Sequence, residues 1–217
     1  MTGGGGCILL HIQTDKPGRA SMAEAPGLLN SRSMSRVADY IYAAPGGLDA
    51  LVVGEFAAEA DAIKAGAVAT GGARTGRAPI VNVFRQIAPP SGWLTARGVE
   101  SGMDRPRSST VLSVVMDVDP DTVSDFHGWY DEEHLPKLVA VPGILCALRY
   151  QALVVDQEPV ASQPSERRVR FLAWYEIADR RVVDSDEFAA ASVLTPRTAE
   201  VTAHLSWASQ LYIDTGS

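Results

Sequence analysis

Short runs of mainly apolar residues recur along the chain, and the same order of runs occurs twice. This pattern of short apolar runs, bounded by polar or turn residues, is typical of β-strands. In the first half it predicts strands at Cys7–Asp15, Ala25–Ser33, Leu48–Phe56 and Pro79–Ile87, with a helix at Ala57–Val68. In the second half it predicts strands at Val111–Asp119, Val141–Tyr150, Val169–Ile177 and Ser206–Ile213, with a helix from Asp184.

The two halves differ in the length of their first helix. Between Asp119 and Pro142 lie 22 residues, enough for a helix, whereas only 10 residues lie between Asp15 and Pro26. We therefore predict the order β-α-β-β-α-β for the second half and the same order with a shortened first helix for the first half. This is the element order of the ferredoxin-like unit.

An internal duplication explains the repeated order, with a period of about 104 residues from Asp15 to Asp119. The fold class is thus predicted as α+β, built from tandem ferredoxin-like repeats. The intervening stretch is rich in Pro, Gly, Ser and Arg, has no period and is predicted to be a linker. The predicted domains are a degenerate first repeat at 1–88, the linker at 89–109 and a second repeat at 110–217.

The first helix of the second half carries the side chains best suited to chemistry. Pro136 disfavours helix at the residue before it, so we expect this helix to end near His134. His127, Asp131 and His134 follow i, i+4, i+7 spacing and therefore share one flank. A metal bound by these three is disfavoured, because they span two turns and no second ligand cluster accompanies them.

Acidic residues crowd this region of the chain. Seven carboxylates lie from Asp117 to Glu133 with no Lys or Arg among them, a charge that would raise the pKa of a nearby histidine. We predict that His134 acts as a general acid or base, with Glu133 or Asp131 tuning it. The structural alternative is that His134 only interacts with the negative end of the helix dipole.

Polar residues also gather on one face of two equivalent strands. His11 and Gln13 share a face of the first strand, and Ser113 and Asp117 share a face of its counterpart. This pattern indicates a wet or ligand-lined interior, or else a sheet face open to solvent.

Composition excludes several classes of protein. The 217 residues carry a net charge of −7 and no basic run, so nucleic acid and anionic membrane are not expected partners. Two cysteines are too few for a disulfide framework and favour a reducing, cytoplasmic location. No 18-residue apolar stretch occurs. We also find no dinucleotide fingerprint, P-loop, G-x-S-x-G or H-E-x-x-H motif.

The second half resembles a known family. The residues that carry the likeness follow the pattern F-x-x-WY-x-x-EH-x-P, then PG, then RY, and are Phe126, Trp129, Tyr130, Glu133, His134, Pro136, Pro142, Gly143, Arg149 and Tyr150. They resemble the EthD-like branch of the dimeric α/β-barrel superfamily. The resemblance implies that the two ferredoxin-like sheets close into a pseudo-twofold α/β barrel around a ligand pocket, with the helices outside.

The resemblance also sets the functional expectation. We predict an enzyme that moves protons on an aromatic, ketonic or lactone-like metabolite without a bound cofactor, as an isomerase, cyclase, lyase or oxygenase. The predicted substrate-binding residues are Tyr130, Trp129, His11, Arg149 and Asp117. The alternatives are a non-catalytic ligand-binding or structural barrel and a haem protein with His134 or His11 as axial ligand. Because the helix at Lys16–Ala25 is short and leaves a sheet face poorly covered, we expect a homodimer.

Overall fold

The tertiary contacts of the chain divide it into two compact units. Unit 1 comprises Met1–Gln86, Ala152–Gln157 and Tyr212–Ser217, and unit 2 comprises Ile87–Gln151 and Glu158–Leu211. The structure is a computed structural model that describes residues 8–14, 36–43, 50–56, 60–63, 80–89, 92–101, 105–155, 168–193 and 195–214.

Unit 1 contains an antiparallel sheet. Its strands are β1 (Ile8–Thr14), β2 (Arg36–Ala43), β3 (Ala50–Phe56) and β4 (Ile80–Ala88). They lie in the order β4-β1-β3-β2, and each neighbouring pair is antiparallel. This arrangement is ferredoxin-like, as the order of the sequence patterns predicted.

The second strand of unit 1 differs from the prediction. The expected strand at Ala25–Ser33 and the short helix at Lys16–Ala25 lie outside the described residues, whereas β2 is formed by residues 36–43. A register shift between Arg36 and Ala38 interrupts the pairing of β2 with β3. The rest of β2, from Ala38 to Ala43, pairs with β3 in continuous register. Of the helix predicted at Ala57–Val68, residues 60–63 are described and are helical.

Unit 2 repeats the same strand order with longer elements. Its sheet contains β5 (Trp93–Thr95), β6 (Gly98–Glu100), β7 (Thr110–Val118) and β9 (Val169–Ile177), together with most of β8 (Ile144–Val155) and β10 (Leu205–Asp214). The order is β10-β7-β9-β8-β5-β6, and β9 pairs antiparallel with both β7 and β8. The four long strands therefore show the ferredoxin-like arrangement.

The segment predicted to be an aperiodic linker contains a hairpin. Strands β5 and β6 pair with each other, and Leu94 of β5 pairs with Ala147 of β8. Gly98 begins β6 with φ of +116°, a conformation that favours glycine at this turn. Trp93 is buried in the same hairpin. This part of 89–109 is thus an extension of the unit 2 sheet, and its strands were too short to produce a recognisable period.

The helical segment after β7 is longer than predicted. It consists of a short 3-10 turn (Pro120–Thr122), α3 (Val123–Trp129), a π-helical turn η2 (Tyr130–His134) and α4 (Leu135–Val139). The expectation that Pro136 ends the helix near His134 was wrong. In the wider π turn the N–H of Leu135 donates to the carbonyl of Tyr130, five residues back. The wider turn accommodates Pro136, which has no N–H to donate and would crowd a regular helix.

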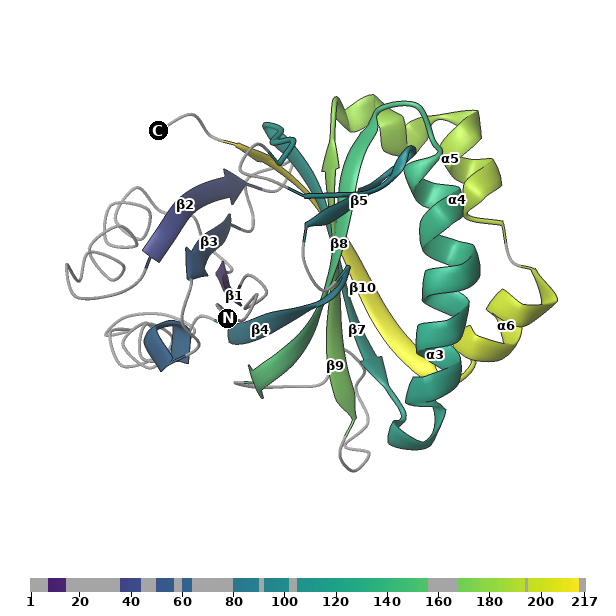
Figure 1. Ribbon diagram of the computed structural model, residues 1–217, viewed down its shortest axis with the longest axis horizontal. Coiled ribbons are helices and arrows are strands. Elements are labelled where there is room, and N and C mark those ends of the chain that lie inside the picture. The colour runs from purple at the N-terminus through teal and green to yellow at the C-terminus, as the bar shows by residue number, and fades with distance from the viewer. Residues whose placement is uncertain are drawn as a thin grey trace. The chain divides into compact units, whose positions relative to one another are not determined.

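The remaining helices of unit 2 follow β9. A short 3-10 turn (Arg180–Asp184) leads to α5 (Asp186–Ala191) and then α6 (Pro196–Thr202). Ser185 and Thr195 cap α5 and α6, each accepting a hydrogen bond from a backbone N–H three residues on. Figure 1 shows α3, α4, α5 and α6 together on one side of β7 and β9.

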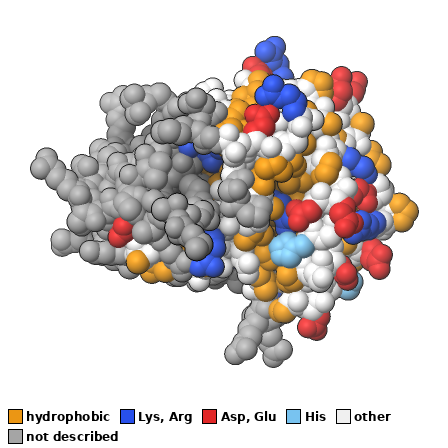
Figure 2. All heavy atoms as spheres, in the orientation of Figure 1, with side chains coloured by type: hydrophobic (Ala, Val, Ile, Leu, Met, Phe, Trp, Pro, Cys, Tyr) orange, Lys and Arg blue, Asp and Glu red, His pale blue; other side chains and the backbone are white. Residues whose placement is uncertain are grey.

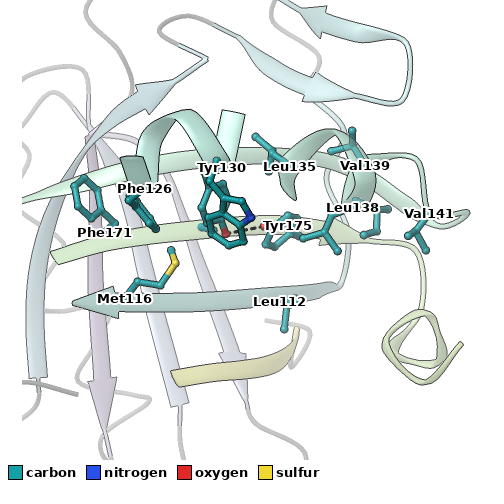
Figure 3. Packing of buried hydrophobic residues seen from close by; sticks show 14 of the residues in the cluster. Leu112, Met116, Phe126, Tyr130, Leu135, Leu138, Val139, Val141, Phe171 and Tyr175 are labelled. Carbon is teal, nitrogen blue, oxygen red and sulfur yellow. Dashed lines mark hydrogen bonds between the residues drawn. The ribbon is translucent and has the colours of Figure 1, made fainter. Parts of the chain in front are cut away.

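The core of unit 2 lies between these helices and one face of the sheet. Register places Leu112, Tyr175 and Ala147 side by side on β7, β9 and β8. All three are buried in a cluster that also contains Phe126 and Leu138 from the helical run. Figure 3 shows Met116 and Tyr175 of the strands next to Phe126 and Tyr130 of the helical run.

The surface of the helices carries charges of both signs. Figure 2 shows acidic and basic side chains next to one another over this side of unit 2. Two of these ion pairs join Lys137 to Glu133, with a nitrogen–oxygen distance of 2.9 Å, and Arg197 to Glu132, with a distance of 3.0 Å. Among the helices that the structure describes, none is both long and apolar enough to span a membrane.

Candidate functional site

A cavity of about 640 Å³ lies inside unit 2, between the sheet and the helices. It is lined by Leu112, Val114, Met116, Trp129, Tyr130, His134, Leu138, Tyr175, Val183, Phe188, Ser192, Thr198, Thr202 and Leu205. These residues are apolar or aromatic apart from one imidazole and several hydroxyl groups. The site thus suits a largely apolar small molecule that offers a few polar atoms.

The cavity lies on the sheet face opposite to the one we predicted. It uses Leu112, Val114 and Met116 of β7, the face that packs toward the helices. For the face of Ser113 and Asp117 the sequence indicated a ligand-lined interior or a sheet face open to solvent, and this stays a prediction. The described cavity is a separate space between the sheet and its covering helices.

His134 is part of the cavity wall and packs against two aromatic rings. Its imidazole is stacked on Trp129, with ring centroids 4.5 Å apart and an interplanar angle of 25°. Tyr130 meets it edge-on at 4.9 Å and 76°. The wide turn η2 ends at His134 and helps to bring these three side chains together. The ring therefore faces the interior, as an acid or base acting on an enclosed ligand must.

The pKa of His134 is lowered, not raised. Burial among the rings is the largest cause, and the positive charge of Lys137 adds to it, so the pKa falls to about 4. The charge of Glu133 acts in the opposite direction but is outweighed, and Arg149 lowers the pKa further. Our expectation of a raised value was wrong because burial of the imidazole outweighs the charge of the neighbouring Glu133 carboxylate. At neutral pH the ring is uncharged and can accept a proton.

Two tyrosines form a hydroxyl pair in the cavity. The Tyr130 and Tyr175 oxygens lie 3.0 Å apart, and both side chains are buried. Figure 3 shows this contact as a dashed line between the helical run and β9. Burial raises the pKa of both phenols, so both stay protonated at neutral pH. Tyr175 was absent from the predicted site, because its place opposite the helix depends on strand pairing that one sequence does not reveal.

Trp129 lies at the side of the cavity next to α6. Its indole N–H donates to the hydroxyl of Thr198 at 3.1 Å. Thr198 in turn lies 2.9 Å from the hydroxyl of Thr195. Trp129 is thus brought to the cavity as predicted, and it is held there by a residue of α6 that the sequence did not single out.

Glu133 lies outside the cavity lining. It accepts hydrogen bonds from Lys137 Nζ at 2.9 Å and from Thr195 Oγ1 at 2.6 Å. Both hydrogen bonds hold the pKa of the Glu133 carboxyl below its usual value, and the one from Thr195 is the larger cause. Glu133 therefore stays ionised, and its charge raises the pKa of His134 without Glu133 itself lining the cavity.

Arg149 and Asp131 belong to a separate polar group, the Arg149 cluster, which also contains His127. The Arg149 guanidinium donates to the Asp131 carboxylate, and its other terminal nitrogen lies 2.7 Å from Nδ1 of His127. It also lies 4.3 Å from the centre of the Tyr130 ring. None of the three lines the cavity. The structure therefore brings Arg149 and Asp131 together but places them behind Tyr130 rather than against a ligand.

Asp117 and His11 lie elsewhere. The Asp117 carboxylate accepts two hydrogen bonds from Arg170, at 2.7 and 2.9 Å, on the sheet face away from the cavity. His11 lies in β1 of unit 1, opposite Val53 and Asn82, and its side chain is outside the described part of the structure. Neither residue joins the described cavity in unit 2.

The lining of this cavity does not fit haem. A haem carries two propionates, and buried carboxylates need cationic or hydrogen-bonding partners. Among the residues that line the cavity there is no Lys or Arg, and His134 is the single imidazole. In the described ranges of the chain, no group of three His, Cys, Asp or Glu side chains could hold a metal ion.

Comparisons with known proteins identify the class of fold. No protein-family model matches the chain, and no curated protein matches it. Among solved structures, an anthrone oxidase-like protein superposes with a TM-score of 0.69 at 11% identity, over 97% of this chain and 92% of that one. A ferredoxin-fold protein of Listeria monocytogenes related to antibiotic biosynthesis monooxygenases superposes with a TM-score of 0.51 at 8% identity, over 98% of this chain and 96% of that one. A monooxygenase-like protein of Listeria innocua superposes with a TM-score of 0.50 at 11% identity, over 98% of this chain and 96% of that one.

At these identities the likeness concerns the fold. The chain has the ferredoxin-like α+β fold found among monooxygenase-like proteins. The chemistry must be argued from the cavity itself, because one fold can serve many unrelated reactions.

Proposed function

We propose that unit 2 holds the active site of a cofactor-independent enzyme that transfers protons on an aromatic or ketonic small molecule. The main observation that supports this proposal is the uncharged imidazole of His134 on the wall of an apolar cavity. An apolar lining excludes charged metabolites, whose burial would lack compensation. A single base without charged neighbours in the lining is the arrangement expected for abstraction of a proton from an apolar substrate.

The low pKa of His134 restricts the substrate. An imidazole with a pKa of about 4 is always available as a base at neutral pH, but it is a weak base. It can take a proton only from an acidic C–H, such as one next to a carbonyl or an aromatic ring. The substrate that fits this requirement is an enolisable aromatic ketone or a related lactone.

The hydroxyl pair of Tyr130 and Tyr175 supplies the second part of the mechanism. When His134 takes the proton from carbon, the electron pair of the C–H bond moves toward the carbonyl oxygen, which becomes an enolate. The tyrosines have two hydroxyl hydrogens and their mutual contact uses one. The other can be donated to the enolate oxygen and stabilise its charge. Return of the proton to the same or another carbon would give exchange or isomerisation.

The test is deuterium exchange into anthrone under anaerobic conditions. Anthrone is an aromatic ketone with an acidic CH₂, and the anthrone oxidase-like structural neighbour makes it a reasonable probe. Proton NMR in D₂O measures loss of the CH₂ signal. We expect exchange faster than in buffer, and a decrease of about 10²–10⁴-fold in His134→Gln, the usual loss for one general base.

The matched control is His204→Gln, since His204 is exposed on the same unit. It should exchange anthrone at the rate of the unmodified protein. Anthrone that binds without any exchange would replace this proposal by a non-catalytic binding protein. Unchanged exchange in a folded His134→Gln variant would remove His134 from the mechanism.

We further propose that the chain is an EthD-like protein in which the two units form a pseudo-twofold barrel, and that these barrels pair as homodimers. The F-x-x-WY-x-x-EH-x-P motif and the ferredoxin-like order in each unit support this proposal. An experimental structure tests the barrel, and sedimentation equilibrium at micromolar concentration tests the dimer.

A further inference from the structure

A chain of four side chains links the cavity to the surface on the side of α6. Trp129 Nε1–H donates to Thr198 Oγ1 at 3.1 Å, and the Thr198 and Thr195 hydroxyls lie 2.9 Å apart. Thr195 Oγ1 then donates to the Glu133 carboxylate at 2.6 Å. The indole can only donate and the carboxylate can only accept, so every hydrogen bond in the chain points toward Glu133.

This fixed direction has a physical consequence. The ionised acceptor polarises Thr195, which becomes a better acceptor for Thr198, and the effect passes to the indole. The chain cannot carry a proton from the ring, because the indole has no site that accepts one. Its effect is therefore on position: it joins both Glu133 of η2 and the Trp129 ring of α3, on which His134 is stacked, to the start of α6.

We propose that Glu133, Thr195 and Thr198 are positioning residues, which hold Trp129 and α6 together so that the imidazole of His134 stays stacked and buried at the cavity. This inference deepens the proposed function, since it concerns the same site. Its test needs neither substrate nor turnover, so its failure and that of the proposed enzyme activity are distinguishable.

A neighbouring ion pair provides a contrast. Glu132 and Arg197 also join η2 to α6, at 3.0 Å, but on the surface. The Glu132 and Arg197 side chains are 70% and 43% exposed, and no hydrogen bond leads from them to Trp129. If docking of α6 alone mattered, loss of Glu132 and loss of Glu133 would have the same effect.

The experiment measures the pKa of His134 and the indole N–H resonance of Trp129 by NMR in single variants. In Thr198→Val we expect the indole resonance to move and the pKa of His134 to rise from about 4 toward its ordinary 6.5 as the ring becomes solvated. Thr202→Val is the matched control. Thr202 also lines the cavity one turn later, but its hydroxyl donates to backbone carbonyls of α6. Thr202→Val should leave the pKa of His134 and the indole resonance of Trp129 unchanged. Thr198→Ser, which keeps the hydroxyl, should also give the values of the unmodified protein.

Glu133→Ala tests the far end of the chain, with Glu132→Ala as control. The Glu133 charge raises the pKa of His134, so loss of the charge alone would lower the value below about 4. Loss of positioning would instead raise the pKa of His134. The direction of the pKa change therefore separates an effect of charge from an effect of position. We expect a rise in Glu133→Ala and no change in Glu132→Ala.

Glu133 is partly exposed, so this substitution is measurable even if Thr198→Val does not fold. The proposal is overturned if the pKa falls or stays near 4 in Glu133→Ala, or if both alanine variants behave alike.

Discussion

The helical run from Val123 to Val139 carries two histidines, and their surroundings differ. His127 has its Nδ1 2.7 Å from an Arg149 nitrogen and its ring edge-on to Phe171. His134 lies on the cavity wall among aromatic rings. Both pKa values are lowered and in both burial is the largest cause, but Arg149 is the next cause for His127 and Lys137 for His134.

The contrast shows that a shifted pKa does not by itself identify a reactive group. In the Arg149 cluster, the polar atoms of His127 and Asp131 bind a buried guanidinium, so the group stabilises the fold. At the cavity, the imidazole contacts rings and open space, and a ligand can reach it. Partners and access, rather than the direction of a shift, separate the two regions.

The largest expected effect concerns stability in the Arg149 cluster. The Arg149 side chain is 1% exposed and lies beneath the Tyr130 ring. Arg149→Met keeps most of the apolar stem but removes the cation and its hydrogen bonds. We expect the free energy of unfolding in urea to fall by about 2–4 kcal/mol, because the charge-assisted hydrogen bonds to Asp131 and His127 and the contact of the cation with the Tyr130 ring are lost together.

Arg181→Met is the control for this measurement. Arg181 also pairs with an aspartate, Asp179, but its side chain is 84% exposed. We expect no measurable change in the free energy of unfolding there, because solvent screens an exposed ion pair. Equal effects of the two substitutions would contradict a structural role of the Arg149 cluster.

The second prediction uses the lowered pKa of His134. Unfolding exposes the ring, whose pKa returns from about 4 to 6.5. Between these values the unfolded chain binds more protons than the folded chain, so the stability contributed by this group is lost as pH falls from 6.5 toward 4. The ring is partly exposed, so we expect an effect of about 1–2 kcal/mol rather than the full amount for such a shift.

Urea unfolding at pH 4.5 and pH 7 measures it. His134→Gln should lose less stability on acidification than the unmodified protein, because glutamine does not titrate. His204→Gln, altered at an exposed site, should keep the original pH dependence. If His134→Gln loses as much unfolding free energy between pH 7 and pH 4.5 as the unmodified protein, the ring is not desolvated.

Much of unit 2 could be predicted from the chain because its strands are compact runs of mainly apolar residues. The patterns at Val111–Asp119 and Val169–Ile177 coincide closely with β7 and β9. Irregular features escaped prediction for local reasons. The π turn before Pro136, for example, prevents the helix break that a proline favours.

The candidate site was predictable only where one element supplies it. Trp129, Tyr130 and His134 lie in one helical run, so their spacing was enough to place them together. Tyr175 and Thr198 approach from β9 and α6, and nothing local in the sequence indicates that approach. Carboxylates adjacent in sequence suggested a raised pKa for His134, but burial outweighs their charge.

The smallest expected effect separates charge from burial at His134. Lys137 lowers the pKa of His134 through its charge, and it pairs with Glu133 in a contact exposed to solvent. Lys137→Met removes that charge while the cavity stays intact. We expect the pKa of His134 in NMR titration to rise slightly, and the free energy of unfolding to change by less than about 0.5 kcal/mol. Because burial is the larger cause, the pKa should stay well below 6.5. A return to 6.5 would mean that charge, and not the aromatic enclosure, keeps the imidazole neutral, and the contrast with His127 would then lose its basis.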